Sequence, residues 1–314
     1  MVDCVVIGGG PAGLSAALNL ARARLSVLVI DSDRPRHAAT LISHGFITRD
    51  GVPPNELRRL AREEVAGYPG VDFWRRSAVR SVSRPAIPTT SDGTHPFTVT
   101  VAGTTPAADR VVHSRTVLVA TGLRETLPAV PGIRGFYGMS LFSCVACDGY
   151  ELNDQPLALI GETDDLYARA LLVAQWTSTL TVFTNGSAAV TAPEALALRE
   201  RGITVERRTI TELEGDRGRL VAVHVDGGDR VPVTGGFVRP FWHPTIEFLS
   251  PLSVADDAFG HLLTDRDGRT SVPGLYAAGD VAAPGPQQLI VAAGAGARTA
   301  AVITHDLLGV TTAH

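Results

Sequence analysis

The first thirty residues contain two apolar runs, with a stretch of helical periodicity between them. Residues 5–7 form a short apolar run that predicts a buried strand. Small and apolar residues then recur at helical spacing from Leu14 to Ala21, and a second apolar run covers 26–30. A strand, a helix and another strand in this order predict a parallel βαβ unit.

The turn between this first strand and the helix is rich in glycine. Its glycines have the spacing G-x-G-x-x-G, in which the first permits a tight turn and the second lets the backbone approach a pyrophosphate. The helix N-terminus offers N–H groups to the phosphates, and an acid ending the second strand can bind a ribose. The cofactor-binding residues expected here are Gly8, Gly10, Pro11, Ala12, Gly13 and Asp31.

The segment 144–151, CVACDGYE, contains Cys144 and Cys147. Closing so small a loop adds little stability, so a disulfide here would be a poor structural staple. Structural zinc needs four ligands, and Cys4 in the first strand is expected to be a small buried hydrophobe. No metal site is expected. A redox-active dithiol is favoured, and a non-catalytic thiol pair stays open as the alternative.

Two further segments carry a resemblance to flavoproteins with two dinucleotide-binding domains. Residues 275–280, a strand followed by Gly-Asp, resemble their C-terminal FAD motif, and 116–123 resemble the strand and Ala-Thr-Gly turn that ends their first FAD segment. With 144–151 after that turn, the whole chain resembles the low-molecular-weight thioredoxin reductases. The resemblance implies FAD as cofactor and adds Thr121, Gly122, Gly279, Asp280, Gln287 and Gln288 to the FAD-binding residues.

The same resemblance implies catalytic roles within 144–151. Cys147 would lie against the flavin, and Cys144 would exchange with the substrate. Asp148 would be the general acid/base, since a thiol nucleophile needs a neighbouring group to take its proton.

An α/β fold follows from the resemblance, with two Rossmann-like dinucleotide-binding domains, the second inserted into the first. The FAD domain is expected to comprise 1–124 and 242–314, and the inserted domain 125–241 carries the dithiol. Residues 83–96, rich in proline and glycine, are expected to form a hairpin loop. A homodimer is also implied.

The second nucleotide fingerprint, expected near residue 161, is degenerate. Gly161 matches its first glycine, but Thr163 and Leu166 replace the other small residues. Three acids, Glu162, Asp164 and Asp165, stand where a diphosphate would lie, and like charges oppose its binding. Thr163 or Asp164 is instead expected to cap the following helix. NADPH and NADH are therefore not expected to reduce the flavin.

Segments 44–65 and 149–151 resemble the thioredoxin-reductase-like dithiol oxidases, which close disulfides in natural products of the gliotoxin and holomycin type. The dithiol oxidases carry histidine at the position of Asp148, whereas the thioredoxin reductases carry aspartate there, as this chain does. The leading hypothesis is an FAD-dependent dithiol oxidase, with dioxygen as acceptor and peroxide as product. Its partner is a small-molecule dithiol or a small redox protein. A reductase fed by ferredoxin or another flavin, and a flavin redox sensor without turnover, stay open.

Charge and composition exclude several other classes of protein. The net charge of −4 gives no basic patch for nucleic acid, and no apolar run reaches the ~18 residues of a membrane span. The N-terminus lacks a signal peptide, so the reducing cytoplasm is expected. The roles of His37 and His44 stay open between lining the flavin or thiol pocket and structural hydrogen bonding.

Overall fold

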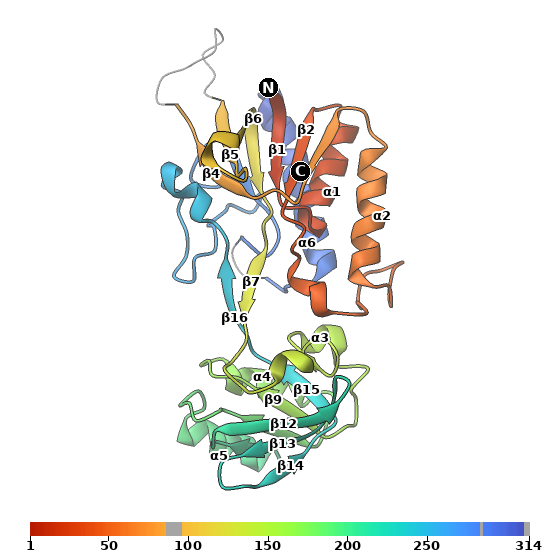
Figure 1. Cartoon of the computed structure of the whole chain (residues 1–314), viewed down its shortest axis with the longest axis vertical. Coiled ribbons are helices and arrows are strands. Elements are labelled where there is room, and N and C mark those ends of the chain that lie inside the picture. Colours follow the sequence, from red (N-terminus) through yellow and green to blue (C-terminus); the bar gives the residue numbers. More distant parts are fainter. Residues whose placement is uncertain (86–95, 283–284, 311–314) are drawn as a thin grey trace.

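Two stacked parts, joined by a pair of strands, form the molecule (Figure 1). The computed structural model describes residues 1–85, 96–282 and 285–310. The joining strands, β7 (Leu123–Thr126) and β16 (Phe241–Pro244), pair antiparallel. Most of the loop expected at 83–96 lies outside the described residues.

The upper part contains a seven-stranded sheet. Its order is β3-β2-β1-β6-β5-β4, and β17 also pairs with β6. Strands β1, β2, β3, β6 and β17 run parallel, whereas β4 and β5 join antiparallel. The bounds are β1 (Val2–Ile7), β2 (Val27–Asp31), β3 (Val71–Arg75), β4 (Val79–Ser83), β5 (Phe97–Val101), β6 (Arg110–Val119) and β17 (Leu275–Ala277).

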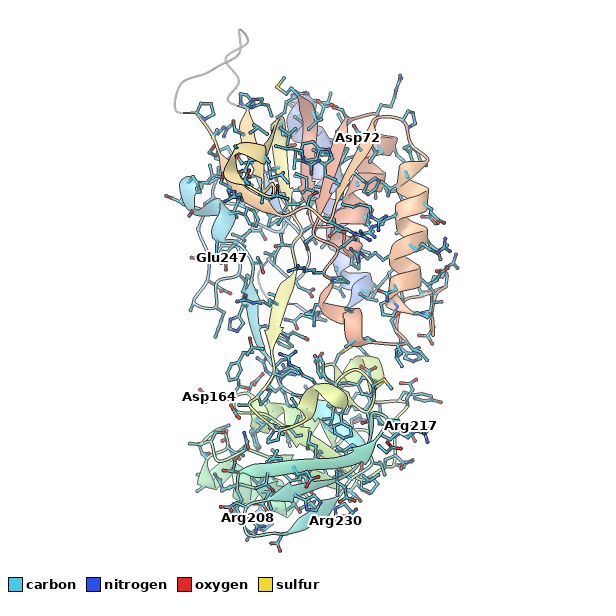
Figure 2. The ribbon with its side chains drawn as sticks, viewed as in Figure 1. Asp72, Asp164, Arg208, Arg217, Arg230 and Glu247 are labelled. Atoms are coloured by element: carbon cyan, nitrogen blue, oxygen red, sulfur yellow. A yellow bond between two sulfur atoms is a disulfide. The ribbon has the colours of Figure 1, made fainter. Side chains whose placement is uncertain are left out.

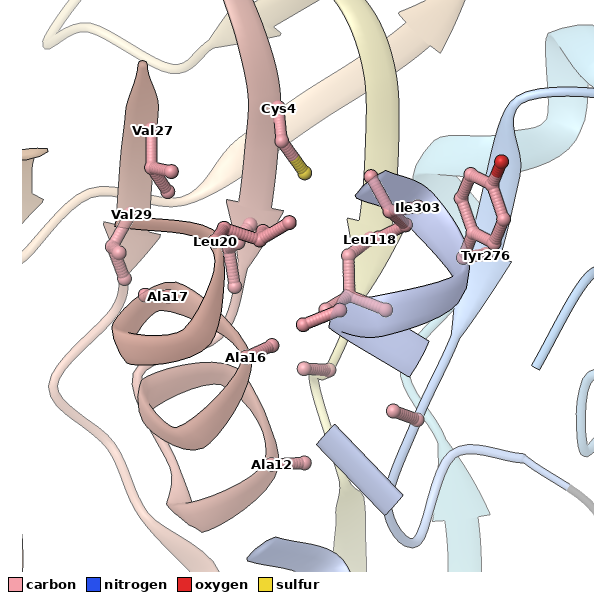
Figure 3. Close-up of a cluster of buried hydrophobic side chains, with 14 of the residues drawn as sticks. Cys4, Ala12, Ala16, Ala17, Leu20, Val27, Val29, Leu118, Tyr276 and Ile303 are labelled. Carbon is pink, nitrogen blue, oxygen red and sulfur yellow. The ribbon is translucent and has the colours of Figure 1, made fainter. Parts of the chain in front are cut away.

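Three helices accompany this sheet: α1 (Pro11–Arg22), α2 (Pro54–Ala66) and α6 (Leu289–Leu308). Helices α1 and α6 share one core cluster with the sheet, in which side chains of α1, β6 and α6 face one another (Figure 3). Cys4 is fully buried in this cluster, as expected for a small hydrophobe. Small residues let the helices approach closely, since a Cβ on Gly296 would lie 2.0 Å from the carbonyl oxygen of Ala12.

The lower part is built on a parallel sheet of order β11-β10-β9-β15-β8. Its strands are β8 (Leu141–Phe142), β9 (Leu157–Ile160), β10 (Leu180–Phe183), β11 (Thr204–Glu206) and β15 (Gly235–Val238), and its helices are α3 (Val145–Asp148), α4 (Leu166–Val173) and α5 (Ala192–Glu200). An antiparallel sheet of β12 (Ile210–Asp216), β13 (Arg219–Val225) and β14 (Arg230–Pro232) completes it.

Four short 3-10 helices lie between these elements: η1 (Arg36–Ala39), η2 (Pro106–Ala108), η3 (Ile133–Gly135) and η4 (Glu247–Leu252). Two sheets, one wholly parallel and one with five parallel strands, each with crossover helices, confirm the predicted α/β fold class with two Rossmann-like units. The boundaries 1–124, 125–241 and 242–314 stay a prediction. Within the described ranges, no helix is long and apolar enough to cross a membrane.

Candidate active site

The expected FAD-binding segments meet at one edge of the upper sheet. Strands β1, β2, β6 and β17 are parallel, and Ile7 is in register with both Ile30 and Val119. Their carboxyl ends therefore lie together, followed by the glycine-rich turn, Asp31, the turn at Thr121 and the turn at Gly279. In parallel α/β sheets this edge is where ligands bind.

The glycines of the first turn fit a dinucleotide. Gly8 has a φ of +112° and a Cβ there would lie 2.3 Å from the carbonyl oxygen of Ala120, whereas a Cβ on Gly13 would lie 1.9 Å from that of Gly8. Gly10 differs, since in the described part of the chain nothing lies within 4 Å of its Cβ position. Gly10 is also the N-cap of α1, so the open space borders the helix N-terminus, where a pyrophosphate is stabilised.

Asp31 ends β2 as predicted, and two arginines of α2 hold its carboxylate. Arg58 donates to Asp31 Oδ2 at 2.6 Å, and Arg62 pairs with the same oxygen. Burial opposes ionisation of Asp31, but the hydrogen bond and charge of Arg58 outweigh it and lower its pKa. The sequence analysis missed these arginines, although their spacing of four residues places them on one face of a helix.

At the other end of the site, Asp280 pairs with Arg36 of η1. Arg36 Nη2 lies 2.7 Å from Asp280 Oδ2, and Arg36 Nη1 lies 3.0 Å from Glu125 Oε1. Gly279 has a φ of +79°, and a Cβ there would lie 2.9 Å from the Cβ of Ala12. The C-terminal motif is therefore packed on the start of α1, as a shared cofactor site requires.

The remaining predicted FAD-binding residues flank these turns. Thr121 Oγ1 donates to the carbonyl oxygen of Thr245 at 3.2 Å, and Gly122 has a φ of +65°. Gln288 is the N-cap of α6, with Gln287 before it, and both are half-buried. His37 lies in η1.

The two cysteines of CVACDGYE form a disulfide at the start of α3. Cys144 is the N-cap of α3, and its carbonyl oxygen accepts from the N–H groups of Cys147 at 3.2 Å and Asp148 at 3.1 Å. This turn holds both sulfur atoms and the carboxylate in one short segment. Helix α3 lies on the side of the lower part that faces the upper sheet (Figure 1).

The carboxyl group of Asp148, next to Cys147, has a strongly raised pKa. Burial and, after it, the negative charge of Glu151 raise its pKa to about 7, although His44 opposes the rise. A carboxyl with a pKa near neutrality can both accept and return a proton, which is the property of a general acid/base. His44 therefore lies close enough to this segment for its charge to act on Asp148.

The turn expected to bind the second nucleotide is held by contacts among its own side chains. A Cβ on Gly161 would lie 2.8 Å from Leu166 Cδ1 and 2.9 Å from Arg239 Cβ. Arg239 Nε binds both carboxylate oxygens of Asp165, at 3.1 and 2.9 Å, and its guanidinium lies 4.0 Å from the ring centre of Trp242. The space beside the first fingerprint glycine is therefore occupied by the chain itself.

Two of the three acids of this turn are also partnered. Glu162 accepts from Asn185 at 2.7 Å, whereas Asp164 is exposed and points into solvent (Figure 2). The predicted cap was wrong: Asp165, not Thr163 or Asp164, is the N-cap of α4, and its side chain makes no capping hydrogen bond. The reason is that Thr163 and Arg239 bind the Asp165 carboxylate and hold it away from the helix.

A cavity of about 230 Å³ lies elsewhere, between α1 and α2. Its walls are mostly apolar and include Leu14, Leu57 and Leu289, with Arg58 at its border. Neither Cys144 nor Cys147 lines it. The dithiol therefore lies outside this cavity.

Comparison with known proteins agrees with this geometry. The crystal structure of HlmI matches with a TM-score of 0.89 and 37% identity over 98% of this chain and 93% of that one. An oxidoreductase from Agrobacterium tumefaciens matches with a TM-score of 0.85 and 30% identity, over 98% and 99%. The thioredoxin reductase of Listeria innocua is 26% identical over 94% of this chain and 90% of its own.

The family model described as "Pyridine nucleotide-disulphide oxidoreductase" matches residues 2–296, which is nearly the whole chain. The match spans the glycine-rich turn, the disulfide and the turn at Asp280. The chain therefore belongs to the pyridine nucleotide-disulphide oxidoreductase family, as an FAD-dependent disulfide oxidoreductase.

Proposed function

We propose that this protein is a dithiol oxidase, which forms a disulfide in a small dithiol and passes the electrons to dioxygen. The observation that carries the proposal is the turn after β9, where Thr163 and Leu166 replace the later fingerprint glycines and Arg239 binds Asp165. A flavoprotein without a nicotinamide donor needs another source of electrons. The other redox group supplied by the described residues is the disulfide Cys144–Cys147, next to an acid of suitable pKa.

The proposed exchange begins with a substrate thiol. The Asp148 carboxylate takes its proton, and the thiolate bonds to Sγ of Cys144 while the Cys144–Cys147 bond breaks. The second substrate thiol loses its proton and attacks the substrate sulfur of this mixed disulfide, which releases Cys144. The substrate leaves as a disulfide, and two electrons and two protons stay with the cysteines and nearby acceptors.

Bound FAD would supply the acceptor for this electron pair and its route to an external acceptor. We propose that the residues holding it are those at the carboxyl ends of the parallel strands of the upper sheet, from the turn at Gly8–Gly13 to Asp280 and Gln288. With dioxygen as acceptor, one dithiol and one dioxygen give one disulfide and one hydrogen peroxide. We also propose the division into an FAD domain, 1–124 with 242–314, and an inserted domain, 125–241, and the homodimer expected from the resemblance.

A second candidate is a thioredoxin or disulfide reductase that receives electrons from ferredoxin or another flavin. The curated relatives that carry the name thioredoxin reductase favour it. In that case electrons would flow from the flavin to Cys147 and leave at Cys144. A redox sensor without turnover has less support, because both cysteines and Asp148 are present with acid/base chemistry in place.

Adding dithiothreitol to the purified protein in air separates these functions. Continuous peroxide production, with one oxygen consumed per dithiol, is the result expected of the oxidase. Flavin bleaching without peroxide would favour the reductase, and a single stoichiometric bleaching without turnover would favour the sensor. A flavin that dithiols do not bleach at all would refute the proposed direction of electron flow.

A further inference from the structure

A small closed loop of the upper part, 43–52, carries His44. Ser43 and Val52 form an antiparallel bridge that closes the loop, and Gly51 N–H donates to the carbonyl oxygen of Ser43 at 3.0 Å. Inside it, Asp50 Oδ1 accepts from the N–H of Gly45 at 2.7 Å. Its other oxygen lies 3.4 Å from His44 Nδ1. The loop therefore fixes one side of the imidazole.

The other side of the imidazole faces the redox segment. His44 Nε2 lies 3.5 Å from Oε1 of Glu151, which follows Asp148 by three residues. Only 23% of the His44 side chain is exposed, against 44% of Glu151. An ion pair with one shielded member is less screened than one on an open surface. This contact joins a loop of the upper part to the turn after α3.

The charges of this group act on Asp148 in opposite directions. Burial and the charge of Glu151 favour the protonated form of Asp148, whereas His44 favours the carboxylate. The charged groups that face His44 are Asp50 and Glu151, and those that act on Asp148 are Glu151 and His44. When the disulfide is reduced, the thiols of Cys144 and Cys147 join them.

We propose that His44 is a positioning residue for the dithiol exchange: held between Asp50 and Glu151, its imidazole ties loop 43–52 to the redox segment and, in its protonated form, favours the carboxylate of Asp148 that takes the substrate proton. The inference rests on the role of Asp148 in the proposed function. The inference also explains why loop 43–52 is closed, because the closed loop places the imidazole of His44 beside the redox segment.

The test compares His44→Gln with His44→Lys. The readout is the pH dependence of flavin reduction by dithiothreitol without oxygen, between about pH 5.5 and 9. Glutamine removes the charge, so the acidic limb of the profile should move to higher pH by roughly 0.5–1 unit. Lysine keeps a positive charge and should leave the midpoint close to that of the wild type.

His224→Gln serves as the matched control. His224 Nε2 also pairs with a carboxylate, Glu214 at 2.7 Å, and is similarly shielded. Glu214 also binds Arg230, at the end of the lower part away from the upper sheet (Figure 2). This variant should keep the wild-type profile. FAD content and circular dichroism of each variant show whether it has folded.

The outcomes distinguish this inference from the proposed function. A His44→Gln midpoint equal to that of the wild type would overturn it, as would an equal shift in His44→Gln and His44→Lys. A lower rate of flavin reduction with an unchanged pH midpoint would show that His44 is only structural, and would also overturn the inference. If dithiothreitol does not reduce the wild-type flavin at all, the proposed function itself fails, and the role of His44 falls with it.

Discussion

Asp148 is a carboxyl group whose surroundings, more than its residue type, decide its chemistry. In water it would be ionised at neutral pH and would be a weak base. Partial burial beside the disulfide and the nearby charge of Glu151 bring its pKa to about 7. The sequence could suggest Asp148 from its place after Cys147, but the pKa depends on burial, which no motif states.

Asp148→Asn should keep FAD and the disulfide but slow flavin reduction by dithiol by roughly 10²–10⁴-fold, since a positioned base contributes about that much. The pH dependence should change as well. Below about pH 7 the wild-type carboxyl is protonated and cannot take a proton, so the wild-type rate should rise through pH 7. The variant should lack this rise and follow only the ionisation of free thiols, at about pH 8.5. An unchanged profile, measured by stopped-flow absorbance, would remove Asp148 from the mechanism.

A second prediction at this scale concerns Asp280. Asp280→Leu places an apolar side chain at the predicted flavin contact and removes one of the two carboxylates that pair with Arg36. FAD should be lost on gel filtration, with free flavin in the late fractions. Asp72→Leu is the control, because Asp72 is an exposed aspartate on β3 (Figure 2). Full FAD retention by Asp280→Leu would contradict the assignment of this edge.

At the scale of elements, α1 and α4 begin in the same topological place, each after the first strand of a parallel βαβ unit. The difference lies in the turn before the helix. Gly10, the second fingerprint glycine, leaves open space at the start of α1. Thr163 stands at the corresponding position before α4, and its hydroxyl donates to Asp165 Oδ1 at 2.6 Å. Similar strands and helices therefore give one site that fits a dinucleotide and one that does not.

NADPH and NADH are accordingly expected not to bind at α4. Anaerobic mixing with a large excess of NADPH should leave the flavin absorbance unchanged on the timescale of turnover, because the site would have to expel Arg239 from Asp165 and Trp242. Isothermal titration with NADP⁺ should likewise give no heat of binding. Fast bleaching by NADPH would show that these side chains move aside, and would restore a conventional thioredoxin reductase.

Sequence patterns were most successful for regular elements. The predicted strand segments 5–7 and 26–30 overlap β1 and β2, because apolar runs between turn residues identify buried strands well. The cap of α4 was predicted wrongly. Arg239, which binds the Asp165 carboxylate, follows it by 74 residues, and local propensity carries no information about such a partner.

For the whole molecule, the connection between the two parts centres on a shielded acid, Glu125 of β7, whose side chain is 10% exposed. Its carboxylate accepts from Arg36 at 3.0 Å, from Tyr137 at 2.7 Å and from the Trp242 indole at 3.2 Å. The upper part, the lower part and both joining strands thus meet at one carboxylate. A shielded acid needs such partners, and this network helps to fix the orientation in which α3 faces the upper sheet.

Residues that belong to short motifs could be proposed from the sequence, whereas the charged residues that bind and orient them could not. The glycines, Asp31, Asp280 and the cysteines belong to short motifs, so their positions and spacing are visible in the chain. Glu125, Arg58 and Arg62 act through partners distant in sequence, and single charged residues show no period. The role of His44 was left open for the same reason.

The central claim is that electrons enter at the Cys144–Cys147 disulfide. It is tested most directly by anaerobic stopped-flow reduction of the flavin with dithiothreitol in the wild type, Cys144→Ser and Cys147→Ser, followed by air. The account predicts fast bleaching of the wild type, FAD that stays bound but oxidised in both variants, and rapid reoxidation of the wild type with one peroxide per flavin. Bleaching of both serine variants at the wild-type rate would place the disulfide outside the electron path and contradict the account.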